Sequence, residues 1–148
     1  MIPIYYRPLA TILLAVFSLH LFTSHTLAAN EEVIETPPEV ERWFGALGSV
    51  NRAEFEKLIA DDATINLKDL GIEQTKQEFI SALDEWEKTT RDASIVYRYE
   101  AIEDGKAKVW VCYRFKSNEQ LNHESFTYAK GIITGSVQEF KGADCGDM

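Results

Sequence analysis

The chain has 148 residues and an acidic composition, with 24 Asp and Glu residues against 15 Lys and Arg residues and a formal net charge of −9. This length is typical of one domain once a targeting segment is set aside. Nucleic acids and anionic membranes require a basic face on their partners, so the composition argues against both.

The first 28 residues have the pattern of a signal peptide. Arg7 is the only charged residue before Glu31, and residues 9–22 form an apolar run that is shorter than a membrane span. Small residues before Ala29 predict cleavage near Ala28. We therefore expect a periplasmic or secreted protein without a stable membrane anchor after processing. An uncleaved N-terminal anchor is the alternative.

The rest of the chain divides into a flexible acidic leader at residues 29–36, one domain at 37–141 and a C-terminal tail at 142–148. Three helix starts are predicted in the domain, each from a short polar residue followed three positions later by Glu, a pattern that satisfies free amides at a helix N-terminus. The pairs are Thr36 with Glu39, Asn51 with Glu54, and Thr75 with Glu78.

The predicted helices carry ordinary packing stripes. Apolar residues recur at helical spacing in the first and third helices, so each helix should cover a core with one face. Gly48 is expected to end the first helix, and a short strand at residues 63–67 follows the second. The two main stripes are Val40, Trp43, Phe44 and Leu47, then Phe79, Ile80, Leu83 and Trp86.

From Arg91 onward the apolar period changes to two, which is typical of strands. A turn at Asp104 and Gly105 separates two long strands, and a turn at Lys130 and Gly131 separates two more. The predicted helices come first along the chain and a four-strand meander follows them, an order that predicts an α+β fold. In it, three N-terminal helices pack on one face of a curved, mainly antiparallel sheet.

Two cysteines, Cys112 in a predicted strand and Cys145 in the tail, would meet an oxidising compartment after export. A disulfide between them would close a loop of about 33 residues, worth roughly 3 to 4 kcal/mol in the chain-entropy model. The alternative is a buried thiol at position 112 and a free thiol at position 145.

Four segments occur in a recognisable order and spacing: "VERWFGAL" at 40–47, "EKLIADDATI" at 56–65, "TKQEFISAL" at 75–83 and "ESFTYAKGIITGSVQEF" at 124–140. Together they resemble the nuclear transport factor 2-like superfamily, which includes the SnoaL-like polyketide cyclases and the steroid delta-isomerases. The resemblance runs from about Pro37 to Phe140 and implies a cystatin-like cone with a central apolar pocket between the first helix and the concave sheet, often in a homodimer.

The same resemblance implies where a catalytic base would stand. In the steroid isomerases, the strand after the "ADDAT" junction carries a carboxylate that abstracts a proton, and the matching position here is Leu67, which cannot act as a base. We interpret Asp61 and Asp62 as parts of the scaffold. Asp69 would reach the pocket only if the alignment shifts by two residues. No complete catalytic set is recognised, so a non-catalytic role is favoured.

Glu124 shares the apolar face of its predicted strand with Phe126 and Tyr128, about where the isomerases carry an acid that stabilises an oxyanion. Burial among aromatic rings should raise the pKa of its carboxyl group, and Tyr113 on the preceding strand is a neighbour. Two interpretations remain open. Glu124 and Tyr113 are polar groups that orient a ligand, or Glu124 makes an internal contact with Tyr113 or Arg98. The predicted ligand-binding residues are Trp43, Leu67, Val111, Tyr113, Phe115, Glu124, Phe126 and Tyr128.

No metal or cofactor is predicted, because His123 is the only histidine outside the signal peptide and its strand register turns it outward. Three functions remain open. The first is a pocket for a small apolar or amphipathic molecule. The second is an isomerase, dehydratase or cyclase that uses Glu124 and Tyr113. The third is a homodimerisation or interaction domain that uses Trp110 and Arg114 on the outer sheet face.

Overall fold

The computed structural model describes residues 35–148 of the chain. The predicted signal peptide at 1–28 and residues 29–34 of the predicted leader lie outside the described residues. Within residues 35–148, no helix is long and apolar enough to cross a membrane.

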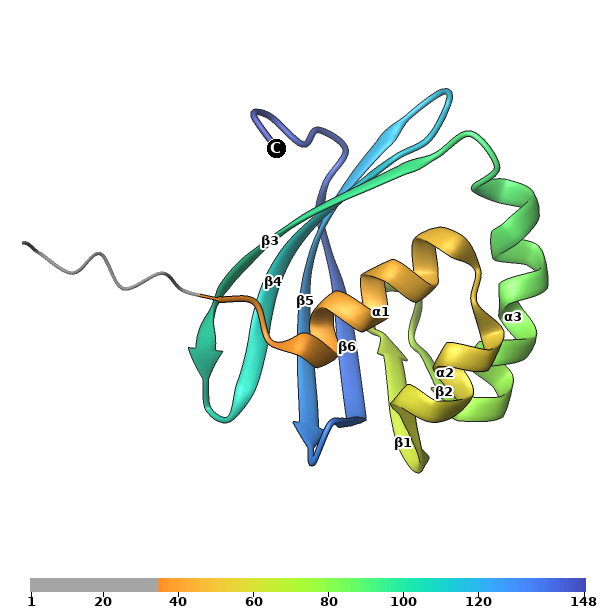
Figure 1. Ribbon diagram of the computed structural model, residues 1–148. Helices are drawn as coiled ribbons and strands as arrows, with labels where there is room; N and C mark the ends of the chain where they lie inside the picture. Colours follow the sequence, from red (N-terminus) through yellow and green to blue (C-terminus); the bar gives the residue numbers. More distant parts are fainter. Residues whose placement is uncertain (1–34) are drawn as a thin grey trace, which may run out of the picture. The chain divides into compact units, whose positions relative to one another are not determined.

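Three α-helices pack on one face of a six-stranded sheet, with α1 running across the curved strands β4 to β6 (Figure 1). The sheet order is β2-β1-β6-β5-β4-β3, and β1 pairs with β6 in parallel while the other neighbours are antiparallel. In chain order the elements are α1 (Pro38–Ser49), α2 (Arg52–Leu58), β1 (Ile59–Leu67), the 3-10 turn η1 (Lys68–Leu70), β2 (Ile72–Thr75), α3 (Lys76–Thr89), β3 (Ser94–Glu103), β4 (Lys106–Arg114), β5 (Glu119–Ala129) and β6 (Ile132–Gly142).

This architecture confirms the predicted α+β fold, the three helices and the four-strand meander, which is β3 to β6. The edge strand β2 was not predicted, because its residues are largely exposed and show no apolar alternation. It forms because Gly71 adopts a left-handed backbone, φ 63°, after η1 and returns the chain alongside β1.

Two of the three predicted helix caps are present. Thr75 and Glu78 form a complete capping box on α3, and Asn51 accepts the backbone N–H of Glu54 on α2. The prediction for Thr36 is wrong, because α1 begins at Pro38 and Pro37 takes the flanking position with ψ 136°. A residue before proline is disfavoured in the helical region, so the Pro37–Pro38 pair delays the helix by one residue.

The C-terminal end of α1 also differs from the prediction. The helix continues past Gly48 to Ser49, and Val50 adopts the left-handed conformation with φ 52°. Its N–H bonds back to the carbonyls of Ala46 and Leu47, which closes the helix in the way a glycine more commonly does.

Trp43 is the centre of the core between the helices and the sheet. Its ring stacks on Phe79 of α3 at 5.0 Å between centroids, and it meets Phe55 of α2 and Phe126 of β5 edge-on at 5.2 and 5.3 Å. One aromatic side chain of α1 therefore joins the other two helices to the concave face of the sheet.

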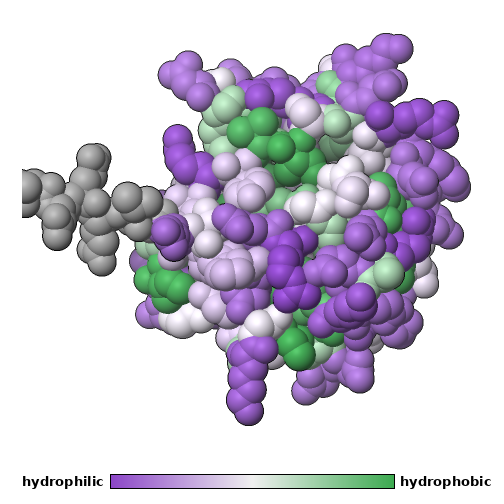
Figure 2. All heavy atoms as spheres, viewed as in Figure 1, coloured by the Kyte–Doolittle hydropathy of each residue, from purple (hydrophilic) through white to green (hydrophobic). Residues whose placement is uncertain are grey.

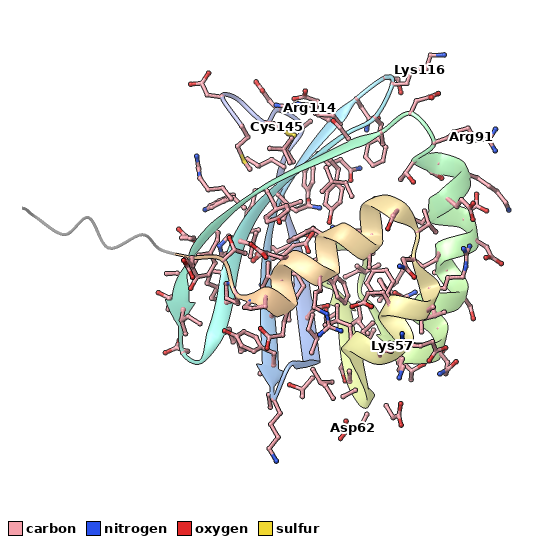
Figure 3. The ribbon with its side chains drawn as sticks, in the orientation of Figure 1. Lys57, Asp62, Arg91, Arg114, Lys116 and Cys145 are labelled. Carbon is pink, nitrogen blue, oxygen red and sulfur yellow. A yellow bond between two sulfur atoms is a disulfide. The ribbon has the colours of Figure 1, made fainter. Side chains whose placement is uncertain are left out.

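The disulfide between Cys112 and Cys145 is formed, with 5.7 Å between the two Cα atoms, so this prediction is confirmed. It fastens the tail to β4. The Cys145 amide also donates to Glu119 Oε2 at 3.2 Å, and the Arg114 guanidinium donates to the main-chain carbonyl of Met148. Arg114 and Cys145 lie close together where the tail meets the sheet (Figure 3).

Candidate functional site

A cavity of about 340 Å³ lies between α1, α3 and the concave face of the sheet. Most of its wall is apolar, and the buried polar side chains in it, Tyr113, Glu124 and Ser136, are on β4, β5 and β6. On the face in Figure 2, exposed apolar residues form small groups separated by polar ones. The cavity is lined by Trp43, Leu47, Ile65, Leu67, Gln74, Phe79, Ala82, Leu83, Glu85, Trp86, Thr89, Tyr113, Gln120, Glu124, Ser136 and Gln138.

Four of the eight predicted ligand-binding residues, Trp43, Leu67, Tyr113 and Glu124, line this cavity. The other four do not. Val111 and Phe126 are fully buried in the core, Phe115 packs against the edge of Trp86, and Tyr128 lies toward the opposite end of β5, in a separate hollow with Glu39. Alternation correctly placed all of them on the inner face. It could not show that α1 covers the middle of that face and separates the cavity at Glu124 from the hollow at Tyr128.

At the open end of the cavity, three neighbouring strands supply a hydrogen-bonded set of side chains: Tyr113, Glu124 and Gln138. Glu124 of β5 lies opposite Val109 of β4 and Gln138 of β6 in the strand register. The Tyr113 hydroxyl donates to Glu124 Oε1 at 2.6 Å, and Gln138 Nε2 donates to the same oxygen at 3.2 Å. Among the described residues, no hydrogen bond engages Glu124 Oε2.

Burial dominates the electrostatics of this group, because Glu124 is only 4% exposed. Desolvation raises the pKa of Glu124 from 4.5 to about 7, although the hydrogen bonds from Tyr113 and Gln138 act in the opposite direction. Burial, together with the adjacent Glu124 carboxylate, also raises the pKa of Tyr113 well above its ordinary value of 10. At neutral pH, Tyr113 is therefore a stable donor and Glu124 is close to half ionised.

Arg98 does not pair with Glu124, although the sequence offered Arg98 as one possible internal partner. Arg98 lies opposite Trp110 in the register of β3 and β4, and both alternate away from the inner-face residues Tyr97 and Val111. Of the two partners that the sequence offered for Glu124, Tyr113 is the one that binds it.

Of the two acids predicted to belong to the scaffold at the "ADDAT" junction, Asp61 has a structural contact. Asp61 Oδ1 binds Lys76 Nζ at 2.8 Å, and the same ammonium group donates to the main-chain carbonyl of Glu56 at 2.8 Å. Lys76 lowers the pKa of Asp61. Asp62 is exposed to solvent in the first half of β1 (Figure 3). Leu67, the position matched to a catalytic base, lines the cavity with an apolar side chain.

A second hollow of about 300 Å³ adjoins the cavity and shares Leu67, Gln120 and Gln138 with it. Its other walls are Asp69, Leu70, Asn122 and Phe140. The Asp69 carboxylate accepts a hydrogen bond from the backbone N–H of Phe140. Asp69, which the sequence offered as a catalytic acid only if the alignment shifts by two residues, therefore makes a structural contact at the rim of the site.

Sequence reasoning missed the contributions of α3 and β6 to the site. Gln138, Ser136 and Gln120 also face the cavity from the inner side of the sheet. Because they are polar, a search for alternating apolar residues does not find them. Counting back from the turn at Lys130 and Gly131 would have paired Glu124 with Val137. A β-bulge next to Thr127 and Tyr128 shifts the register by one residue and brings Gln138 opposite Glu124, and the sequence carries no clear signal for this shift.

On the outer face of the sheet, His123 Nε2 lies 2.9 Å from Glu100 Oε2 and its ring lies against Trp110. His123 is thus outward-facing, as predicted. Arg114 is engaged by Glu119 at 3.0 Å and by the tail. The interface role of this face stays a prediction.

Within the described part of the chain, the one cluster with the composition of a metal site is Cys112, Glu119 and Cys145. Its two sulfur atoms form the disulfide, so they are not available as thiolate ligands.

No protein-family model matches the sequence, and no curated protein matches it. Solved structures do match. A candidate ketosteroid isomerase from Kribbella flavida aligns at 17% identity with a TM-score of 0.60, over 72% of this chain and 77% of its own. A protein with a ketosteroid isomerase-like fold from Catenulispora acidiphila, in complex with trimethylamine, aligns at 14% identity with a TM-score of 0.61, over 72% and 88%.

IdmH from Streptomyces antibioticus, a candidate polyketide cyclase, aligns at 12% identity with a TM-score of 0.59, over 70% of this chain and 89% of its own. At these identities the likeness concerns the fold. The chain has the nuclear transport factor 2-like fold shared by ketosteroid isomerase-like and polyketide cyclase-like proteins, as its sequence segments indicated.

Proposed function

We propose that the protein binds a small apolar or amphipathic molecule in the cavity between α1, α3 and the sheet. The observation that carries this proposal is a cavity of about 340 Å³ with mostly apolar walls and one buried carboxyl group at its polar end. Pockets that bind small molecules commonly combine apolar walls with a few convergent polar groups. Tyr113 and Gln138 orient Glu124, and Oε2 remains for the ligand.

Ligand binding is tested by native mass spectrometry of protein purified without detergent, followed by titration with toluene, benzyl alcohol and cyclohexanol. Trp43 and Trp86 line the cavity, so their fluorescence reports occupancy. Ala82→Phe places a ring at the exposed edge of the cavity and should abolish binding. Ser81→Phe is the matched control, because Ser81 is exposed on the same helix and does not line the cavity. Equal binding by both variants would contradict the proposal.

An enzyme of the isomerase, dehydratase or cyclase class is the second candidate, and Glu124 is the observation that favours it. A carboxyl group with a pKa of about 7 and one free oxygen can exchange a proton with a bound substrate at neutral pH. The test is the exchange of the α-protons of a small ketone in D₂O, followed by NMR. Exchange that persists unchanged in Glu124→Gln would remove this candidate, since Leu67 supplies no alternative base.

We also propose that the protein is exported and processed near Ala28. The Cys112–Cys145 disulfide supports this, because disulfides persist mainly in oxidising compartments. Expression of the full chain in a bacterial host should yield periplasmic protein whose mass corresponds to a chain that starts at Ala29. Recovery only in the cytoplasm with Met1 retained would contradict export.

A further inference from the structure

We propose that the ligand of this cavity is an organic cation, an amine or quaternary ammonium compound with an apolar body, whose charged nitrogen pairs with Glu124. The inference rests on the proposed binding function and names the chemical class of the ligand. Three observations support it: the acidic lining of the cavity, the Glu124 Oε2 atom that accepts no hydrogen bond from the described residues, and the aromatic lining, whose indole N–H groups are bonded or buried.

The wall of the cavity carries acids without bases. Glu124 and Glu85 line it, and among the described lining residues there is no Lys, Arg or His. Glu85 is exposed and pairs with Lys88 at 3.1 Å outside the lining, so the charge argument depends mainly on Glu124. The adjoining hollow adds Asp69 and, within the same part of the chain, no basic residue. The whole chain has a net charge of −9. An anionic ligand would meet like charge at Glu124 and Asp69, whereas a cation is attracted to them.

Glu124 is a buried carboxyl group, and no basic side chain among residues 35–148 contacts it. Its two partners, Tyr113 and Gln138, are neutral and both bind Oε1. Buried charge is unfavourable unless it is paired, and the chain follows that rule elsewhere, where the buried Lys76 ammonium binds Asp61. A cationic ligand at Oε2 would supply the missing partner.

The aromatic walls present rings rather than hydrogen-bond donors. Trp43, Phe79, Trp86 and Tyr113 contribute to the lining of the cavity, and aromatic rings attract cations. Trp43 and Phe79 stack on each other, so one face of each of these two rings is covered. The indole N–H of Trp86 already donates to the Leu47 carbonyl at 3.1 Å. The indole N–H of Trp43 has no partner among the described residues, but less than 1 Å² of that nitrogen is exposed, so a molecule in the cavity does not reach it.

The affinity for a cation should follow the ionisation of Glu124. The titratable groups that line the cavity with it are Tyr113 from β4 and Glu85 from α3, while α1, β1 and β6 contribute only uncharged residues. Burial raises the pKa of Glu124 to about 7, so the carboxylate that a cation needs predominates above pH 7 and is lost below it. A bound cation in turn lowers this pKa.

Calorimetric titration with three probes of similar shape separates the charge states: benzylamine, benzyl alcohol and benzoate. At pH 8 we expect benzylamine to bind about tenfold more tightly than benzyl alcohol, and benzoate to bind most weakly. Between pH 8 and pH 5.5 the affinity for benzylamine should fall by up to about 30-fold, which is the loss of ionised Glu124 for a pKa near 7. The affinity for benzyl alcohol should not change.

Glu124→Gln keeps the shape of the side chain and removes its charge, so the preference for benzylamine should disappear while benzyl alcohol still binds. Glu103→Gln makes the same charge change on the exposed β3–β4 hairpin and should leave all three affinities unchanged. If Glu124→Gln fails to fold, the pH series on the unmodified protein decides the question.

A wild-type cavity that binds benzyl alcohol as tightly as benzylamine overturns the cation inference and leaves the binding function standing. Retention of the amine preference in Glu124→Gln also overturns it. A protein that binds none of the three probes, and none of the neutral panel used to test the binding function, overturns both proposals.

Discussion

Glu124 should make the protein less stable as the pH rises, and Glu124→Gln should remove that dependence. Burial raises the pKa of this carboxyl group from 4.5 to about 7. The folded protein therefore holds the proton more tightly than the unfolded chain, so the stabilisation is fully present below pH 4.5 and is lost as the pH rises through 7. One pKa unit corresponds to about 1.4 kcal/mol, which gives a loss of about 3 kcal/mol.

Urea unfolding of the wild-type and Glu124→Gln proteins at pH 5 and pH 8, followed by tryptophan fluorescence, measures this loss. The other titrating groups are common to both proteins, so the difference between their unfolding free energies isolates position 124. Relative to the variant, the wild type should lose about 2.5 kcal/mol between the two pH values. A difference that is independent of pH, or one that grows in favour of the wild type as the pH rises, would refute the reasoning.

Three further predictions concern the scaffold. Thr75→Ala breaks the capping box of α3 and should lower the unfolding free energy by about 1 kcal/mol, whereas Thr36→Ala should have little effect because Thr36 caps no helix; thermal unfolding compares them. Replacing Cys112 and Cys145 together by Ser should cost about 3 to 4 kcal/mol in urea unfolding, and an unchanged midpoint would contradict this. Lys76→Met leaves the Glu56 carbonyl without its donor and should cost about 1 to 3 kcal/mol in the same assay.

The binding and enzyme proposals use the same atoms and differ in one missing group. Tyr113 and Glu124 form a donor and acid pair of the kind that stabilises charge developing on a substrate oxygen. The position that the resemblance assigns to a catalytic base is Leu67, which lies two strands from Glu124 in the same sheet and cannot take a proton, so Glu124 itself would have to act as the base. Occupancy of the cavity without turnover is the outcome that this arrangement favours.

The local architecture followed from the sequence. Apolar spacing identified the helices and the meander, and the Thr75 and Asn51 caps located two helix starts, because these features depend on residues only a few positions apart. Predictions failed where two neighbouring residues compete, as at Pro37 and Pro38. They also failed where a strand such as β2 is held by pairing with a distant segment and not by its own residues.

The sequence by itself also determined which side of the sheet Glu124, Tyr113, Phe126 and Tyr128 would face, since strand alternation depends only on position in the strand. Only the tertiary structure decided which of them meet a ligand. The path of α1 across the sheet buries Phe126, leaves Tyr128 outside the cavity and opens a space at Glu124. Strand pairing, not sequence order, then brings Gln138 to Glu124 Oε1 and leaves the second oxygen without a hydrogen bond from the described part of the chain.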